Sequence, residues 1–176
     1  MNTDNYVYDD KGSGNFGDYD IEHEIYTNAP NSSTNQWGYV GVSNSVDDAY
    51  NWTSGQVHWC QPASASQFWM IERLTDKGNA NNDVIAQHAR NVRYYMKMER
   101  SGTTATLKSY TDSGRTTLED TASITSETTT YQYIYGVSSW NVGTSGRSNS
   151  YESDNLEIID AGVGPAPTFI PKVMFF

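Results

Sequence analysis

Hydrophobic and polar positions alternate with a period of two along several short stretches of this chain. The clearest stretch is residues 17–26 (GDYDIEHEIY). Its largely apolar row consists of Tyr19, Ile21, His23 and Ile25, and its acidic row consists of Asp18, Asp20, Glu22 and Glu24. Successive side chains of a β-strand point to opposite faces of a sheet. The pattern therefore predicts a strand with one face packed on a second layer and one wet, acidic face.

Similar stretches recur about every ten residues, between turns rich in Gly, Asn and Ser. The expected strands are residues 5–9, 17–26, 37–43, 67–73, 91–100, 103–110, 116–120, 129–138 and 152–159. The expected loops are residues 28–36, 44–55, 77–83 and 139–150. A Ser-Gly pair at positions 101 and 102 predicts an antiparallel hairpin. With no amphipathic helix expected, the predicted fold is an all-β, antiparallel two-sheet β-sandwich over residues 1–161.

Composition and charge narrow the classes of partner. The 176 residues suit one domain, and the single cysteine, Cys60, rules out an internal disulfide and is expected to be a buried or half-buried thiol. Eleven basic and 21 acidic residues give a net charge of -10, so we expect no nucleic-acid partner. No basic-then-apolar leader opens the sequence, and it contains no apolar run of about 18 residues, so we expect no membrane partner.

Four local patterns then resemble a known family. Residues 6–9 (YVYD) with 16–22 (FGDYDIE) resemble its opening strands, and residues 94–103 resemble its central hairpin. Residues 112–120 are similar to the hairpin that follows, and residues 154–158 (DNLEI) to its closing strand. The family is that of the concanavalin A-like lectin and glucanase jelly rolls, especially the laminin-G-like modules of extracellular and viral proteins. The resemblance implies a sandwich on an extracellular or virion surface, and such folds host lectins, glycosidases and structural modules.

The glycosidase alternative depends on the acidic row. Laminarinase-type relatives place a nucleophile Glu, a helper Asp and an acid/base Glu at alternate positions of one strand. The matching residues are Asp20, Glu22 and Glu24, in which the first two residue types are exchanged. The outer two also lie about 13 Å apart along a strand, whereas retaining enzymes need about 5 to 5.5 Å between carboxyl groups. We therefore expect a solvated stripe and no enzyme, with His23, His58 and His88 as core or interface histidines.

Two loops have the composition that sugar binding needs, because an aromatic face takes a sugar's C–H patch while amides and carboxylates bind its hydroxyl groups. The predicted ligand-binding residues are Asn51, Trp52, Trp140, Asn141, Arg147 and Asn149. Asp47 and Asp48 could also hold Ca²⁺ through hard oxygen ligands. The alternative is that Trp52 and Trp140 cover the edges of the core while the polar residues solvate the loops.

The end of the sequence suggests assembly. Residues 162–176 consist of a Gly/Pro linker, 162–167, and an apolar arm, 168–176. The arm's apolar residues are Phe169, Ile170, Val173, Met174, Phe175 and Phe176. Such a segment is unfavourable in water, so it either folds back on its own sandwich or adds as a strand to a neighbouring subunit.

Three functions follow from these patterns. The first is a noncatalytic carbohydrate-binding or adhesion module of an extracellular or viral assembly, with a glycan as its partner. The second is a structural subunit of a viral particle or extracellular filament that assembles with its own kind or with neighbouring subunits through the arm. The third is a glycoside hydrolase.

Overall fold

The computed structural model describes residues 6–27, 35–47, 51–62, 67–75, 78–89, 91–141 and 151–159. Within these ranges the chain forms eleven β-strands and no α-helix. The strands are β1 (Tyr6–Asp10), β2 (Tyr19–Thr27), β3 (Asn35–Ser43), β4 (Ser54–Pro62), β5 (Gln67–Thr75), β6 (Gly78–His88), β7 (Arg93–Ser101), β8 (Thr104–Tyr110), β9 (Leu118–Thr125), β10 (Tyr133–Asn141) and β11 (Tyr151–Ile159). Among the residues described, no helix is long and apolar enough to cross a membrane.

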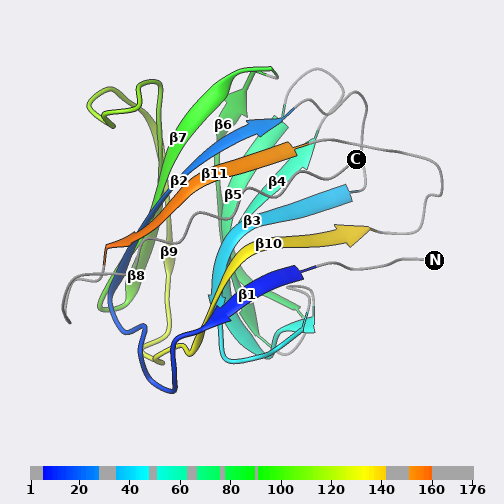
Figure 1. Cartoon of the computed structure of the whole chain (residues 1–176), viewed down its shortest axis with the longest axis vertical. Helices are drawn as coiled ribbons and strands as arrows, with labels where there is room; N and C mark the ends of the chain where they lie inside the picture. Colours follow the sequence, from blue (N-terminus) through cyan, green and yellow to red (C-terminus); the bar gives the residue numbers. More distant parts are fainter. Residues whose placement is uncertain are drawn as a thin grey trace.

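The strands form two sheets that face each other (Figure 1). The six-stranded sheet has the order β1-β10-β3-β4-β5-β6, and the five-stranded sheet has the order β11-β2-β7-β8-β9. Every pairing is antiparallel. The predicted antiparallel two-sheet β-sandwich is therefore confirmed.

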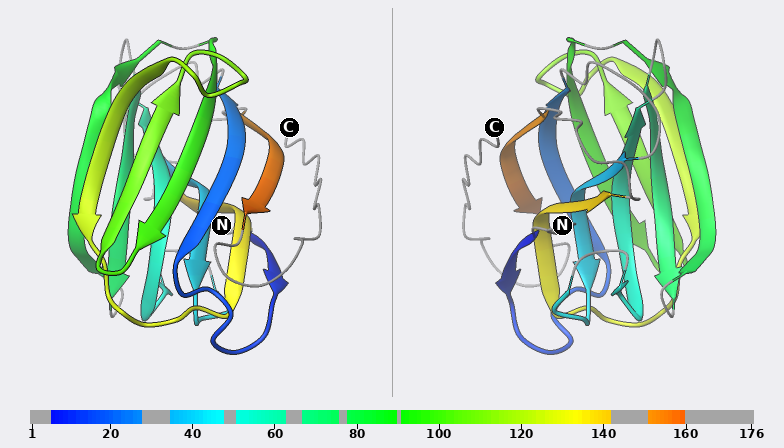
Figure 2. Two further views of the ribbon diagram at one scale, coloured as in Figure 1. Left: turned by 90° about the vertical axis from the view of Figure 1, so that its left-hand side faces the viewer. Right: turned by 90° about the vertical axis from the view of Figure 1, so that its right-hand side faces the viewer.

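The edges of the two sheets lie in pairs on opposite sides of the molecule (Figure 2). β1 and β11 are the edge strands on one side, and β6 and β9 are the edge strands on the other. On the β6 side, the Asp83 carboxylate accepts a hydrogen bond of 2.9 Å from the backbone N–H of Ser123 in β9. A side chain therefore satisfies one edge amide of β9, which is one way in which proteins protect an exposed strand edge.

The core lies between the sheets and follows the alternation in the sequence. Tyr19, Ile21, His23 and Ile25 are all buried, as the period-2 pattern of β2 predicts. The other buried core residues are Phe16, Val40, Val42, Ile71, Ile85, Tyr94, Met96, Met98, Ala105, Leu107, Ala122, Ile124, Tyr131, Ile134, Leu156 and Ile158. Val92 immediately precedes β7 and is 41% exposed.

The hairpin of β7 and β8 confirms the expected Ser-Gly turn. Arg100 pairs with Ala105 and Ser101 with Thr104 across the turn. Gly102 has a φ of 57°, in the left-handed region that glycine adopts without the strain of a Cβ atom. The turn therefore fixes the register that buries Met96, Met98 and Leu107 on one face.

Three expectations about strand boundaries are wrong. Residues 78–83 of the turn predicted at 77–83 are instead the first half of β6, whose polar residues pair with β5 at the sheet edge. β4 was not expected at all, because its inward positions include the polar Gln56 and His58. β10 runs as far as Asn141, so residues 139–141 belong to a strand and not to the second loop.

A small cluster of aromatic residues lies on the outer face of the six-stranded sheet. Trp52 is fully buried there, although it precedes β4 in a loop. Its ring lies over Gly41 and Gly55, where a Cβ atom would come within 2.7 Å and 2.5 Å of it. The Tyr135 ring packs beside it, with ring centres 4.6 Å apart. Two glycines on neighbouring strands thus leave the space that the indole ring fills.

We predict that Gly55→Ala destabilises the fold. The added methyl group would lie 2.5 Å from Trp52 and 2.8 Å from the Val42 carbonyl oxygen, so Trp52 or the backbone has to move. Overpacking of this kind costs about 1 to 3 kcal/mol. Urea unfolding measures the difference, with Gly17→Ala as the control, because the nearest atom to its Cβ position is 3.9 Å away. Equal stability of the two variants would show that Trp52 is not packed on the glycines.

Candidate functional site

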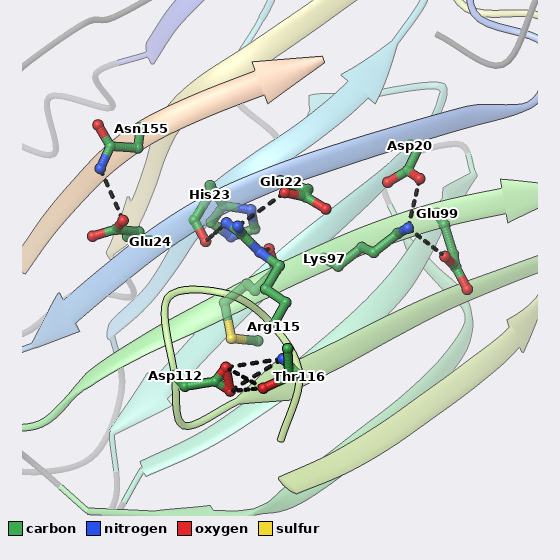
Figure 3. Close-up of polar contacts among 11 residues, drawn as sticks. Asp20, Glu22, His23, Glu24, Lys97, Glu99, Asp112, Arg115, Thr116 and Asn155 are labelled. Atoms are coloured by element: carbon green, nitrogen blue, oxygen red, sulfur yellow. Dashed lines mark hydrogen bonds and ion pairs between the residues drawn. The ribbon is translucent and has the colours of Figure 1, made fainter. Parts of the chain in front are cut away.

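The acidic row of β2 lies on the outer face of the five-stranded sheet (Figure 3). Asp20 forms a 2.6 Å ion pair with Lys97. Glu22 pairs with Arg115 at 2.9 Å. The third carboxylate, Glu24, pairs with Arg93 at 3.2 Å and also accepts a hydrogen bond of 2.8 Å from the Asn155 amide. Three carboxylates of the expected solvated stripe are therefore half-buried, and each is matched by a cation. The fourth, Asp18, is exposed and accepts a hydrogen bond of 2.8 Å from the backbone N–H of Gly102.

The ion pairs continue across β7 and β8. Lys97 contacts Glu99 at 3.4 Å, and Glu99 in turn pairs with Lys108. Partial burial lowers the pKa of Lys97, but the hydrogen bond and charge of Asp20, together with Glu99, raise it overall above its ordinary value. Partial burial raises the pKa of Glu99, but Lys108 and Lys97 hold it below its ordinary value overall. Lys97 and Glu99 are therefore charged at neutral pH and stabilise each other as an ion pair.

The loop between β8 and β9 folds over the middle of this row. Asp112 stabilises the loop, because its carboxylate accepts backbone hydrogen bonds from Thr116 (2.9 Å) and Thr117 (2.8 Å). These bonds hold the pKa of Asp112 below its ordinary value. Arg115 has a φ of 51° and extends across the sheet, where it donates to the backbone oxygens of Met96 (3.3 Å) and His23 (3.4 Å). The Arg115 guanidinium therefore lies beside Glu22 and pairs with it, as Figure 3 shows.

Two histidines meet in the core beneath this row. His23 of β2 and His58 of β4 are fully buried, and their Nε2 and Nδ1 atoms lie 3.0 Å apart, so one ring donates a hydrogen bond to the other across the two sheets. The expected core histidines are confirmed at these two positions. Burial lowers the pKa of His23 well below its ordinary value, and the nearby His58 and Arg115 lower it further. The side chain of His88 lies outside the described residues.

The first predicted binding loop folds onto the outer face of the six-stranded sheet. The Trp52 indole N–H donates to the backbone oxygen of Asp47 at 2.9 Å, and the Tyr135 hydroxyl donates to the backbone oxygen of Ser45. Asn51 donates to the Asp47 carboxylate at 3.4 Å. Because the Trp52 ring is fully buried, it holds the loop in place and does not present a face for a sugar. The alternative role, an aromatic residue that covers a sheet surface, fits Trp52.

Tyr8 and Tyr133 form an aromatic surface next to this loop, and neither was expected as a site residue. Tyr8 of β1 is 41% exposed, and its ring centre lies 5.5 Å from that of Tyr133 and 5.6 Å from that of Tyr135. Asp10 accepts a hydrogen bond of 3.0 Å from the amide of Gln132, next to Tyr133. The alternation of tyrosines in the YVYDD and YIYG segments could have predicted this surface, because it places the tyrosines on one face of two strands that pair.

The predicted calcium site stays a prediction. The Asp47 carboxylate accepts from the Asn51 amide, and Asp47 is the one member of the proposed pair that the structure describes. Among the described residues, no group of three or more His, Cys, Asp or Glu side chains could share a metal ion. Asp48 lies outside those residues.

Several predicted site residues cannot be compared with the structure in full. Trp140 and Asn141 lie on β10, where they pair with Gln36 and Asn35, and their side chains are outside the described residues. The remaining predicted residues are outside the described ranges altogether: Arg147, Asn149, Phe169, Ile170, Val173, Met174, Phe175 and Phe176. The domain boundary at residues 161 and 162 lies there too, and the side chain of Cys60 is likewise not described.

Solved structures share this architecture at very low sequence identity. The exoplasmic/lumenal domain of VIP36, in a Ca²⁺/Man-bound form, is 9% identical with a TM-score of 0.59, over 98% of this chain and 80% of that one. Scytalido-glutamic peptidase with a peptide-based transition state analog is 9% identical with a TM-score of 0.55, over 91% and 83%. A functionally unknown protein from Saccharomyces cerevisiae is 10% identical with a TM-score of 0.55, over 90% and 74%.

These likenesses show a β-sandwich like that of the VIP36 exoplasmic/lumenal domain, and they show the fold alone. The sequence matches no protein-family model and no curated protein. The same architecture carries a sugar-bound domain and a peptidase, so the function has to be argued from the side chains of this chain.

We predict that acid destabilises the protein through the histidine pair. The folded-state pKa of His23 is below the value of about 6.5 for an exposed histidine, so below pH 6.5 the unfolded chain binds a proton that the folded protein does not. Stability is then fully present above pH 6.5 and falls as the pH drops, by at most about 1.4 kcal/mol per pH unit for one proton.

Urea unfolding between pH 7.5 and 5.5 measures this slope. The control is the double variant His23→Leu with His58→Leu, which replaces both partners by apolar groups and leaves neither ring unpaired. The slope should shrink in the double variant. An unchanged slope would assign the acid sensitivity to other groups.

Proposed function

We propose that this protein is a noncatalytic carbohydrate-binding module that serves adhesion on an extracellular or virion surface. The observation that carries the proposal is the exposed ring of Tyr8, which packs against Tyr133 and Tyr135 beside a polar loop. The likeness of the fold to a mannose-bound lumenal domain supports this class of function. Neither nucleic acid nor a membrane is proposed as a partner.

The tyrosine surface has the two components of a sugar site. The face of Tyr8 offers an apolar platform of fixed orientation, because the Tyr133 ring stands edge-on to it at an interplanar angle of 88°. Polar groups lie on both sides of the platform. Asp10 and Gln132 lie toward the end of β1, while Asp47 and Asn51 lie in the loop that Tyr135 holds. Carboxylate and amide groups of this kind bind sugar hydroxyls and set specificity.

Side-chain contacts hold the described parts of this loop, residues 44–47 and 51–53, against the sheet. Trp52 fixes its C-terminal part over Gly41 and Gly55, and the Tyr135 hydroxyl bonds to the backbone of Ser45 and Asp47. A preformed loop loses little conformational entropy when a ligand binds. Binding of a sugar at Tyr8 therefore does not require the described parts of the loop, residues 44–47 and 51–53, to order first.

The charge pairing on the opposite face supports a noncatalytic function. A retaining glycosidase needs one carboxyl group as the nucleophile and a second as the acid/base, both open to the substrate. In this chain Asp20, Glu22 and Glu24 are each engaged by a cation. Arg115 pairs with Glu22, the middle carboxylate, and the hydrogen bonds of Asp112 stabilise the loop that carries Arg115. The arrangement favours a structural function for this row.

Replacing Tyr8 by alanine should weaken glycan binding by about 1 to 3 kcal/mol, a range measured for stacking of bases on aromatic side chains. A glycan array with and without Ca²⁺ identifies the ligand, and isothermal titration calorimetry on the best hit measures the change. Tyr110→Ala is the matched control, because this half-buried tyrosine lies on β8 of the other sheet. Equal affinity of Tyr8→Ala and Tyr110→Ala would remove the tyrosine surface from consideration.

Hydrolysis of polysaccharides tests the acidic row. We predict no turnover of β-glucans or of the glycans that bind on the array. Reducing-end release is measured for the wild type, Glu22→Gln and Glu24→Gln. Activity in the wild type that disappears in both folded variants would make the protein a glycosidase and contradict the proposed function.

A further inference from the structure

Two arginines enter the space between the sheets at the end of the sandwich where β2 begins. Arg100 of β7 pairs with Tyr19 of β2 and is 4% exposed. Arg73 of β5 pairs with Gln56 of β4 and lies two residues after the core residue Ile71, on the same face of the strand. Arginine is seldom buried unless a carboxylate pairs with it. In the described part of the chain, neither arginine forms an ion pair with a carboxylate.

Backbone oxygens and aromatic rings surround the Arg100 guanidinium. Nη1 donates to the backbone oxygens of Thr129 at 2.7 Å and Glu127 at 3.3 Å, and Nη2 donates to that of Phe16 at 3.4 Å. The Tyr19 and Tyr131 ring centres lie 5.6 Å and 5.1 Å from its Cζ atom. These contacts stabilise the cation through dipoles and ring faces. Its full positive charge remains at the end of the core.

Gln56 connects Arg73 to the same layer. The Gln56 side chain accepts a hydrogen bond from the Tyr19 hydroxyl and donates one to the Ser126 hydroxyl, and both bonds are buried. Arg73 is the neighbour of Gln56 on the next strand and points to the same face. The two arginines therefore approach one layer from opposite sheets, each beside one member of the hydrogen-bonded Tyr19–Gln56 pair.

Three buried donor groups in this layer have no hydrogen-bond partner in the described structure. They are Nε of Arg73, Nε of Arg100 and the hydroxyl of Tyr131, a residue with no exposed surface. Burial and the charge of Glu127 raise the pKa of Tyr131, Arg100 and Arg73 lower it, and the outcome is a pKa of about 12, so this hydroxyl keeps its proton at neutral pH. A buried donor without an acceptor is unfavourable, and an ion or a water molecule commonly resolves such a case.

The charges favour an ion over water. The carboxylate that reaches this layer is Glu127, and it accepts from the hydroxyls of Ser54 and Thr129, both at 3.3 Å. The guanidinium groups of Arg73 and Arg100 and the carboxylate of Glu127 together carry a net charge of one positive unit. The space between stacked sheets is about 10 Å and is largely filled by side chains, so a bound group has to be small.

We propose that Arg73, Arg100 and the Tyr131 hydroxyl form a binding site for a small inorganic anion between the two sheets. The two guanidinium Nε–H groups can only donate, and the Tyr131 hydroxyl has one proton to donate, so an anion can accept from all three. The site is separate from the tyrosine surface and does not depend on the proposed glycan binding. The anion would join the two sheets at one end, as the histidine pair joins them farther along the core.

Thermal unfolding in different salts tests the site. The full-length protein is compared in sodium chloride, sodium phosphate and sodium gluconate at equal ionic strength, because gluconate is too large for the space between the sheets. An anion that binds only the folded state raises Tm by about 3 °C or more at ten times its dissociation constant. We expect chloride or phosphate to give this rise and gluconate to give none.

Two variants locate the effect. Tyr131→Phe removes one hydroxyl group with little change in shape, and Arg73→Gln removes the charge that is less deeply enclosed. Each should reduce the anion-dependent rise in Tm at least twofold. Arg93→Gln is the control, because Arg93 pairs with Glu24 on the outer face, and it should keep the full rise. Equal salt responses in the wild type and all three variants, or no difference among the three salts, would overturn the site.

Discussion

The fold depends on the burial of one face of β2 between two sheets. A shift of one residue in the pairing of β2 with β7 would exchange Ile21 and His23 for Asp20 and Glu22 in the core. Burying unpaired carboxylates costs far more than burying apolar side chains contributes. The alternation therefore selects a single register, and that register aligns the ion pairs outside and the histidine pair inside.

Sequence patterns predict most of the strands in which one face is apolar. β2, β7, β8 and β11 were expected near their observed positions, because local alternation and a Ser-Gly turn define them. β4 and β6 were missed for a physical reason. β4 places Gln56 and His58 inside, and β6 is an Asn-rich edge strand, so tertiary pairing and not local hydrophobicity makes them strands. Such pairing depends on residues far apart in the chain.

The candidate sites were harder to predict than the strands. Trp52 has the residue type of a sugar platform, but it is buried in the space that a glycine on β3 and a glycine on β4 leave, and no local pattern in the sequence joins Gly41 to Gly55. Tyr8 and Tyr133 come together only through the pairing of the first strand with the tenth. Arg73 and Arg100 likewise meet only because two sheets face each other. In each case the sequence shows the type of residue but does not predict which residues surround it in the fold.

The hydrogen bond from Ser123 to Asp83 has a consequence for how such modules can be joined. The hydrogen bond uses the backbone N–H of Ser123 on the side where β6 and β9 are the edge strands. A strand from another molecule would therefore first have to displace the Asp83 carboxylate there. The flank formed by β1 and β11 holds the other two sheet edges. Addition of a strand from another molecule would therefore favour the β1 and β11 edges over the β6 and β9 edges, and an assembly built in this way would grow in one direction.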